Sequence, residues 1–432
     1  MREGDTAFLY ELARDSEELK LLEYLADAEK PIIRYRAAEL LGGLRTGTNS
    51  QSEERIGTAL LRTAKNDESD DVRAAAIDAM YLRDEGYLER LIEEVAASEV
   101  NDPPKWMDVD RVTDWLAADQ SEFRMVAAAA VGRIGDDTAV PALVDAVADA
   151  DVRVRTKAAE ACGKIGDPRA IDALASRLDD PQNQVRRAAA AALASIGTRR
   201  AVEALAPAAR SETESVRVIA VGELDRFGSL EPLPLLVEAL EDGSELVRRT
   251  ATRTILELLA NAPAERSHDV RHEVAEGIFD ASPPDLAAQL LTILQGNQPA
   301  YIRRNATWLL GRVAENEREY PDGVVDYLIR ALDDEDELTA KFALSTLVEL
   351  EDPSLLERLR EFLERDDVSE AATSRAEFVR KKRAEANRPS REAVTNSVEY
   401  TYVSDPSDYT AKKRERGSGS STDAVDDSDS NE

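Results

Sequence analysis

Apolar positions repeat every 31 residues through the middle of this chain. Segments that begin at Val154, Val185, Val216 and Val247 align without gaps, and a segment from Phe123 precedes them at the same step. Weaker copies of the pattern begin at Ile33, Val72, Ile302 and Leu338. Nine copies with such spacing predict a repeat protein in which each copy is one supersecondary unit.

Each unit is predicted to contain two helices. A first helix leads into an acidic turn around Asp149 and Asp151, whose short side chains can cap the next helix. The second helix carries an apolar stripe at spacings of three and four, formed by Val154, Ala158, Ala159, Cys162 and Ile165. Glycine follows this helix in several units, where a left-handed C-terminal residue is expected, at Gly135, Gly166, Gly197 and Gly228.

The alanine-rich stripe lets neighbouring helices approach closely, but one helix pair buries too little apolar surface to be stable alone. Stacking of neighbouring pairs supplies the core, as in a quasi-one-dimensional solenoid. The sequence therefore predicts an all-α solenoid of about nine helix pairs.

The spacing is interrupted twice, and both ends of the chain differ from the middle. The steps from Val72 to Phe123 and from Val247 to Ile302 are longer than 31, which predicts inserts near 98–117 and 261–283. The second insert is expected to hold an extra helix. The predicted organisation is N-terminal capping helices at 1–45, a repeat solenoid at 46–363, a basic helical extension at 364–388 and a disordered Ser- and Asp-rich tail at 389–432.

Arginine recurs at one position of the repeat, just inside the second helix. It occupies Arg34, Arg73, Arg124, Arg155, Arg186, Arg217, Arg248 and Arg303, with Thr339 as the exception. A planar guanidinium beside an acidic turn can bridge carboxylates and carbonyls of adjoining turns. We therefore interpret this series as a structural ladder, because a binding site rarely needs so many equal copies.

The motif VRTKAAEACGKIGDPRAIDAL from Val154 resembles HEAT repeats of the phycobilisome-lyase-like type, over residues 30–363. The resemblance implies a HEAT-type α-solenoid whose second helices line a concave face. It also implies two functions: a binding scaffold, or a lyase-like enzyme or small-ligand carrier. Halophilic archaea use proteins of this type beside taxis genes, as adaptors between signalling proteins and the motor, so the resemblance suggests such an origin.

Several basic and aromatic residues are candidates for binding a partner. Extra basic residues on the second helices are Arg133, Lys157, Lys164, Arg187, Arg226, Arg249, Arg253 and Arg304. A basic strip in an otherwise acidic protein suits an acidic partner, although some of these residues must pair with local acids. The first insert contributes Trp106 and Trp115, which either anchor a partner or cap a local core. The tail contributes Tyr400, Tyr402 and Tyr409, in a segment that either docks on a partner or folds back on the solenoid.

The formal net charge of the 432-residue chain is -32, and the acidic residues are spread along its whole length. We interpret this charge as adaptation to a salty cytoplasm, because molar salt screens the repulsion within such a surface. The same charge makes binding to nucleic acid or anionic lipid unlikely. The acidic N-terminus and the lack of a long apolar run predict a cytoplasmic protein without a membrane span.

The residues that commonly carry catalysis or bind metals are scarce. The single Cys162 lies in the apolar stripe, where core packing is expected. His268 and His272 lie four residues apart, but no third metal ligand can be named for them. A related HEAT-type enzyme, deoxyhypusine hydroxylase, holds two irons on repeated His-Glu pairs, whereas only His272-Glu273 occurs here. We therefore expect no cofactor and a non-enzymatic scaffold or adaptor that binds a protein partner, in signalling or taxis.

Overall fold

The computed structural model describes residues 6–45, 50–83, 85–98, 112–281, 283, 285–316, 321 and 323–386. Every regular element in these ranges is a helix, which confirms the predicted all-α fold. The chain divides into two compact units, residues 1–210 and residues 211–432. Trp106, the three tail tyrosines and the predicted tail at 389–432 lie outside the described residues.

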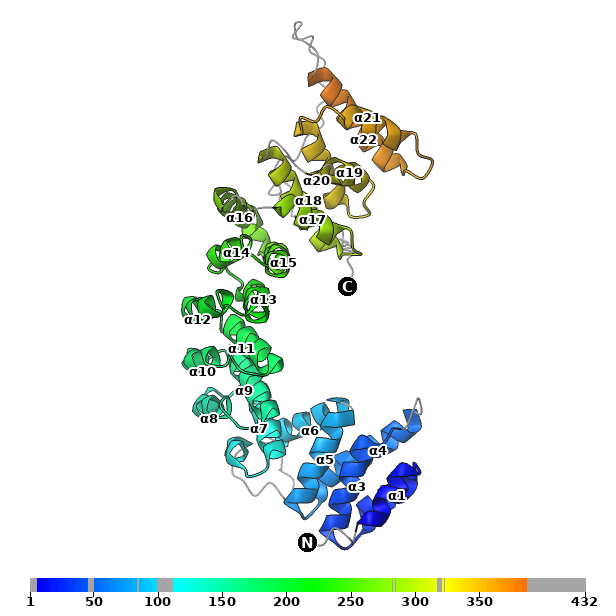
Figure 1. The fold of residues 1–432 in the computed structure, drawn as a ribbon, viewed down its shortest axis with the longest axis vertical. Helices are drawn as coiled ribbons and strands as arrows, with labels where there is room; N and C mark the ends of the chain where they lie inside the picture. Colours follow the sequence, from blue (N-terminus) through cyan, green and yellow to red (C-terminus); the bar gives the residue numbers. More distant parts are fainter. Residues whose placement is uncertain are drawn as a thin grey trace, which may run out of the picture. The chain divides into compact units, whose positions relative to one another are not determined.

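The first unit is a stack of helix pairs, with first and second helices in separate columns. Its second helices are α3 (Pro31–Gly43), α5 (Asp70–Arg83), α7 (Ser121–Ile134), α9 (Val152–Ile165) and α11 (Asn183–Ile196). Its other α-helices are α1 (Ala7–Arg14), α2 (Glu18–Asp27), α4 (Ser50–Asn66), α6 (Glu85–Ser98), α8 (Val140–Ala146), α10 (Ile171–Ala175) and α12 (Arg199–Ala209). Figure 1 shows α8, α10 and α12 in one column and α7, α9 and α11 in the other. Short 3-10 helices η2 (Val112–Ala117), η3 (Asp137–Ala139) and η4 (Pro168–Ala170) complete the unit.

The second unit continues the same arrangement with one additional helix. Its second helices are α13 (Glu214–Gly222), α15 (Glu245–Asn261), α18 (Ala300–Asn316), α20 (Glu337–Glu349) and α22 (Glu370–Ala386). Its first helices are α14 (Leu233–Ala239), α17 (Leu286–Leu294), α19 (Gly323–Ala331) and α21 (Leu355–Leu363). The additional helix α16 (Ser267–Ala281) lies in the second predicted insert and packs against α14, α15 and α18. Two 3-10 helices, η5 (Leu224–Phe227) and η6 (Ala264–Arg266), complete the unit.

The residues predicted as a basic extension form the second helix of a further pair. Helix α22 packs on α20 and α21 and buries Ala372, Ala376 and Val379. These three residues, spaced by four and three, form an apolar stripe that the basic composition of the segment concealed. The helix-pair pattern therefore continues beyond Leu363, where the sequence analysis ended it.

Consecutive second helices of the first unit approach one another through glycine and alanine. A Cβ atom added at Gly132 or Gly163 would lie 2.7 Å from the Cα atom of Ala161 or Ala192, respectively. Gly42 faces Ala79 in the same way at 2.9 Å. This close contact confirms the prediction that the alanine-rich stripe lets neighbouring helices approach.

The predicted helix ends and the predicted buried cysteine are also confirmed. Gly135, Gly166, Gly197 and Gly228 follow their helices with φ values of 75°, 76°, 67° and 64°. Cys162 is fully buried, and burial raises the pKa of its thiol to about 12. The thiol therefore acts as a packing group.

Five of the eight arginines form the predicted ladder between turns, whereas Arg73, Arg186 and Arg248 donate to carbonyl oxygens of the turn before their own helix. Arg155 donates from Nη1 to the carbonyl oxygens of Asp149 and Ala150 at 2.8 and 3.0 Å, and from Nε and Nη2 to both carboxylate oxygens of Asp180 at 2.9 and 3.2 Å. We call such an arginine and the aspartate of the following turn a clamp. The clamps are Arg34–Asp67, Arg124–Asp149, Arg155–Asp180, Arg217–Asp242 and Arg303–Asp334.

The clamps predict that the fold loses stability in acid. For Asp149, Asp180 and Asp242, burial disfavours ionisation, but hydrogen bonds from arginine and from a backbone N–H outweigh it, so their pKa values are lowered. A lowered carboxyl pKa adds stability above the unfolded-state value, and this stability is lost as the pH falls below about 4. We expect urea midpoints to fall steeply below that pH, and a midpoint constant down to about pH 2.5 would contradict this assignment.

Most large apolar side chains of the described helices are buried in the stack, although Leu19, Leu82 and Leu246 are exposed. Within the described ranges, no helix is both long enough and apolar enough to cross a membrane.

Candidate functional site

Two of the four candidate basic residues on the second helices of the first unit are paired with acids of the same unit. Arg133, in the last turn of α7, pairs with Glu89 and Glu93 of α6. Lys157 on α9 pairs with Glu160 one turn later, at 3.0 Å. These two candidates are therefore held in local ion pairs.

Arg153, which the sequence analysis did not single out, gathers three carboxylates on this face. Its guanidinium donates to Glu122 at 2.9 Å, to Asp151 at 2.8 Å and also to Asp78. The Arg153 hydrogen bond is the largest cause of the lowered pKa of Asp151, about 2. Since three acids surround one base, this part of the first unit is acidic despite its arginines.

Lys164 and Arg187 are exposed on α9 and α11 of the first unit, and neither has an ion pair within the described part of the chain. Trp115 is only 8% exposed, and its ring lies 5.7 Å from that of Phe123 on α7. This position fits the alternative that Trp115 caps a local core, because a buried ring offers little surface to a partner.

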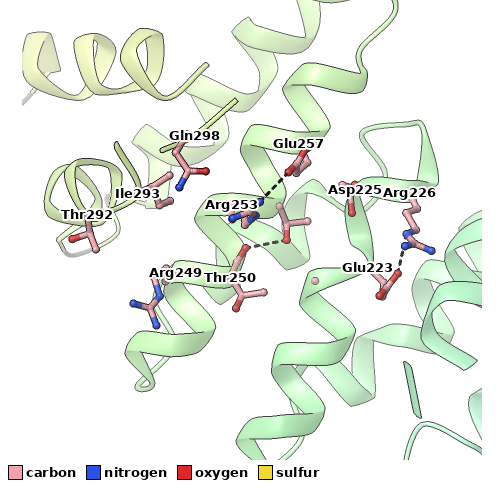
Figure 2. Close-up of a pocket in the computed structure, with 12 residues that line it drawn as sticks. Glu223, Asp225, Arg226, Arg249, Thr250, Arg253, Glu257, Thr292, Ile293 and Gln298 are labelled. Carbon is pink, nitrogen blue, oxygen red and sulfur yellow. Dashed lines mark hydrogen bonds and ion pairs between the residues drawn. The ribbon is translucent and has the colours of Figure 1, made fainter. Parts of the chain in front are cut away.

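The second unit brings three of the candidate bases together around a pocket. Arg226 lies in η5, and Arg249 and Arg253 lie one turn apart on α15 (Figure 2). The pocket has a volume of about 510 Å³. Its other lining residues are Gly222, Glu223, Asp225, Thr250, Thr254, Glu257, Thr292, Ile293 and Gln298.

The pocket coincides with the second interruption of the repeat. Its lining comes from α13, η5 and α15 before the additional helix α16, and from α17 and the loop before α18 after it. Where second helices follow one another directly, as α7, α9 and α11 do, glycine-alanine contacts close the space between them. The insert therefore leaves space between α15 and α17. On the other side, α13 and α15 follow one another directly but lack the close contact, because a Cβ atom added at Gly222 would lie 3.6 Å from Thr250.

The charges in the pocket are only partly paired. Arg226 lies 3.0 Å from Glu223, whereas Arg253 lies 3.8 Å from Glu257, at the long end of an ion pair. Arg249 is exposed and has no ion pair within the residues that the structure describes. Figure 2 shows Gln298 and Ile293 across the pocket from Arg253. Arg249 and Arg253 can thus offer guanidinium N–H donors to an incoming carboxylate or phosphate.

Two groups at the pocket have altered proton affinity. Burial raises the pKa of the Asp225 carboxyl. The charge of Glu257 raises the pKa of the exposed Tyr301 at the start of α18. The first shift indicates that Asp225 is partly buried in the pocket wall, whereas Tyr301 is exposed beside the pocket.

Arg304, the last candidate base, makes a bidentate ion pair with Asp336 of the next helix pair. Its Nε and Nη2 atoms lie 3.1 and 2.7 Å from the two carboxylate oxygens. His272 pairs with Glu276, and the described residues contain no cluster of three potential metal ligands. The three pocket arginines were predicted from the sequence, whereas Gln298, Glu257 and Thr250 of the lining were not. The sequence signal that could have located them is the step of 55 residues from Val247 to Ile302. This step is longer than the usual 31 residues, so neighbouring second helices are not expected to pack directly on one another there.

Comparisons with known proteins give one family. The model for HEAT repeats matches residues 109–194, 174–256 and 287–377. A HEAT repeat-containing taxis protein of Halobacterium salinarum is 40% identical over 373 residues, which are 86% of this chain and 89% of that protein. An engineered protein of known structure is 18% identical, with a TM-score of 0.48, and the match covers 84% of this chain and 98% of the engineered protein. A chain in the complex of CpcE and CpcF of phycocyanin lyase from Nostoc is 20% identical, with a TM-score of 0.31. That match covers 62% of this chain and 92% of the lyase chain.

Proposed function

The chain belongs to the HEAT-repeat family, and from this premise we propose that it is a non-enzymatic scaffold that binds a protein partner along its second helices. In HEAT arrays these helices form the concave face, which is the extended surface that repeat proteins use for binding. The pocket lined by α13, η5, α15, α17 and the loop before α18 is the centre of the proposed surface. Its partner is a protein that presents an acidic side chain to Arg249 and Arg253.

One observation carries this proposal: the pocket holds arginine donors that the fold leaves without a close acceptor. Arg249 has no ion pair in the described part of the chain, and Arg253 is paired only at 3.8 Å. In the first unit, Arg133 and Lys157 are held by local acids, and Lys164 and Arg187, which have no ion pair among the described residues, do not line the pocket. Arginine that stays available in a preformed pocket is typical of an interface anchor.

The partner is proposed to belong to the taxis machinery. Support comes from the 40% identical relative, which is named a taxis protein and is matched over 89% of its length. The acidic composition agrees with work at high salt, where long-range charge steering is screened and direct contacts must provide the specificity.

The experiment compares wild type with the double variant Arg249→Glu, Arg253→Glu, purified by affinity from the native host in molar KCl. We expect the variant to lose its co-purifying taxis proteins by at least about tenfold, because each truncated or reversed charge contact at an interface costs about 2 kcal/mol or more. The matched control is Arg199→Glu, Arg200→Glu on first helix α12, where Arg199 pairs with Glu203 and Arg200 with Asp172. Equal loss in both variants, or no loss in either, contradicts the proposed surface.

The size of the pocket supports a second candidate function, a small-ligand carrier or lyase-like protein. A volume of about 510 Å³ lies within the range of sites for small organic ligands. Native mass spectrometry of the protein purified from its host distinguishes the two. A stoichiometric small molecule that is lost in the Arg249→Glu, Arg253→Glu variant, without any co-purifying protein, favours the carrier.

A further inference from the structure

One face of helix α15 in the second unit carries a continuous stripe of side chains along the pocket. Its members are Leu246, Arg249, Thr250, Arg253 and Glu257, at the spacings of three and four residues that keep side chains on one face of a helix. All of them except Leu246 line the pocket (Figure 2). The stripe from Leu246 to Glu257 is about 16 Å long, because a helix rises about 1.5 Å per residue. The pocket lining therefore continues along α15 to an exposed apolar side chain.

The large apolar side chains exposed in the described part of the second unit flank this stripe. They are Leu246, which is 42% exposed, and Tyr301 at the start of α18, which is 41% exposed. The charge of Glu257 is the largest cause of the raised pKa of Tyr301, and the charges of Arg253 and Asp225 also act on it. Tyr301 thus lies beside the Glu257 end of the stripe, whereas Leu246 forms its other end.

The stripe places two arginines between two apolar side chains. Arg249 has no ion pair among the described residues, and Arg253 is paired only at 3.8 Å. In molar salt the Debye length is about 3 Å, so charge contacts alone attract a partner weakly. Burial of apolar surface is not screened in this way. The two exposed apolar side chains are therefore suited to supply affinity, while the arginines select for an acid.

The construction of the surface indicates which backbone conformation a bound segment has. The pocket lining comes from helices and the loop before α18, so it has no strand edge that could pair with an extended peptide. A helix satisfies its own backbone N–H and C=O groups and presents its side chains along one face. About three turns of helix match the length of about 16 Å.

We propose that the pocket binds an amphipathic helix of the partner protein, about three turns long, with an acidic side chain between two apolar ones. The acid pairs with Arg249 and Arg253, and the apolar side chains pack on Leu246 and Tyr301. This docking mode rests on the proposed scaffold function, because it specifies which part of the partner binds at the same surface.

The test titrates the full-length chain with the partner protein isolated by the affinity purification proposed above, in molar KCl. We expect the variant Leu246→Ser, Tyr301→Ser to bind at least about tenfold more weakly, because a few buried anchors carry most of the affinity of an interface. Tyr301→Phe keeps the ring and should bind like wild type. The matched control is Leu19→Ser on first helix α2, which changes a leucine that is 67% exposed and should leave binding unchanged. Wild-type affinity in the double serine variant, or equal loss in the control, overturns the proposed helix site.

The arginine and serine variants separate the helix site from the function on which it rests. If Arg249→Glu, Arg253→Glu loses the partner while the double serine variant keeps it, the scaffold function stands and the apolar anchors are wrong. If no protein co-purifies with wild type, both are wrong. Since Leu246 and Tyr301 are exposed, hydrogen exchange of α15 in the unbound serine variant should equal that of wild type, which separates lost binding from lost folding.

Hydrogen exchange of the partner protein in the same complex identifies the bound segment. We expect protection of a helix in which two apolar residues lie about eleven positions apart, with Asp or Glu between them on the same face. Protection of an extended segment, or of a helix without an acid at those positions, contradicts the proposed docking mode.

Discussion

Replacing Asp180 with alanine is expected to lower the free energy of unfolding of the first unit by about 3–5 kcal/mol. The Asp180 side chain is 2% exposed and accepts hydrogen bonds from Arg155 and from the backbone N–H of Gln182. Its removal leaves the guanidinium of Arg155 buried beside two carbonyl oxygens but without a counter-charge. Native-state hydrogen exchange of α9 and α11 in molar salt measures the loss.

Asp172 provides the matched control for this clamp. It also binds an arginine through both carboxylate oxygens, at 2.8 Å from Nη2 of Arg200, but its side chain is 81% exposed. Asp172→Ala should therefore cost less than about 1 kcal/mol, as exposed ion pairs do. If the two variants lose equal stability, the clamps are not the structural ladder described above.

The second large effect is expected at Gly163, where the variant Gly163→Ala should lower the free energy of unfolding of the first unit by about 2 kcal/mol. An added Cβ atom would lie 2.7 Å from the Cα atom of Ala192 and 2.9 Å from its Cβ atom. The clash involves the backbone of α11, so it can be relieved only by moving one helix away from the other. Such a shift also weakens the neighbouring apolar contacts.

The control for this prediction is Gly43→Ala at the end of α3, where nothing lies within 4 Å of the added Cβ atom. Alanine lowers the conformational entropy of the unfolded chain, so this variant should gain about 0.5–1 kcal/mol. Opposite signs at the two positions, measured by the same exchange experiment, support close helix contact. A gain at Gly163 would show that the second helices do not touch there.

The repeat explains how much of the fold could be predicted. The 31-residue spacing located the second helices, and Gly166 and its equivalents located their ends, because both depend on local backbone and side-chain preferences. The role of the arginine series could also be predicted from its regular recurrence. The aspartate partners of Arg155 and Arg217 could not, since they lie in the following turn and only the stacking brings them within 3 Å.

The candidate site could be predicted only in part for a related reason. The position of Arg249 and Arg253 in the repeat predicts that both lie on a second helix. Whether a basic residue forms an ion pair, however, depends on which acidic side chain of the next helix pair lies near it. Arg304 meets Asp336, whereas Arg249 meets no acid among the described residues, and the repeat pattern does not distinguish them.

Helix α22 shows the limit of composition as a guide. The segment from 364 to 388 was predicted as a basic extension because of its lysines and arginines, yet three small apolar residues are enough to join it to the stack. Two of its arginines also take part in that packing, because Arg375 and Arg383 donate hydrogen bonds to the carbonyl oxygens of Leu332 and Val348.

The central claim is that the second-helix face around the pocket binds a protein partner, and a hydrogen-exchange footprint tests it most directly. The full-length chain is compared alone and in complex with a partner protein isolated by the affinity purification proposed above, in molar KCl. Protection is predicted for α15 and for the segment from Gln298 to Tyr301, with no change in first helices α8, α10 and α12. Protection confined to those first helices, with α15 unchanged, would contradict the claim.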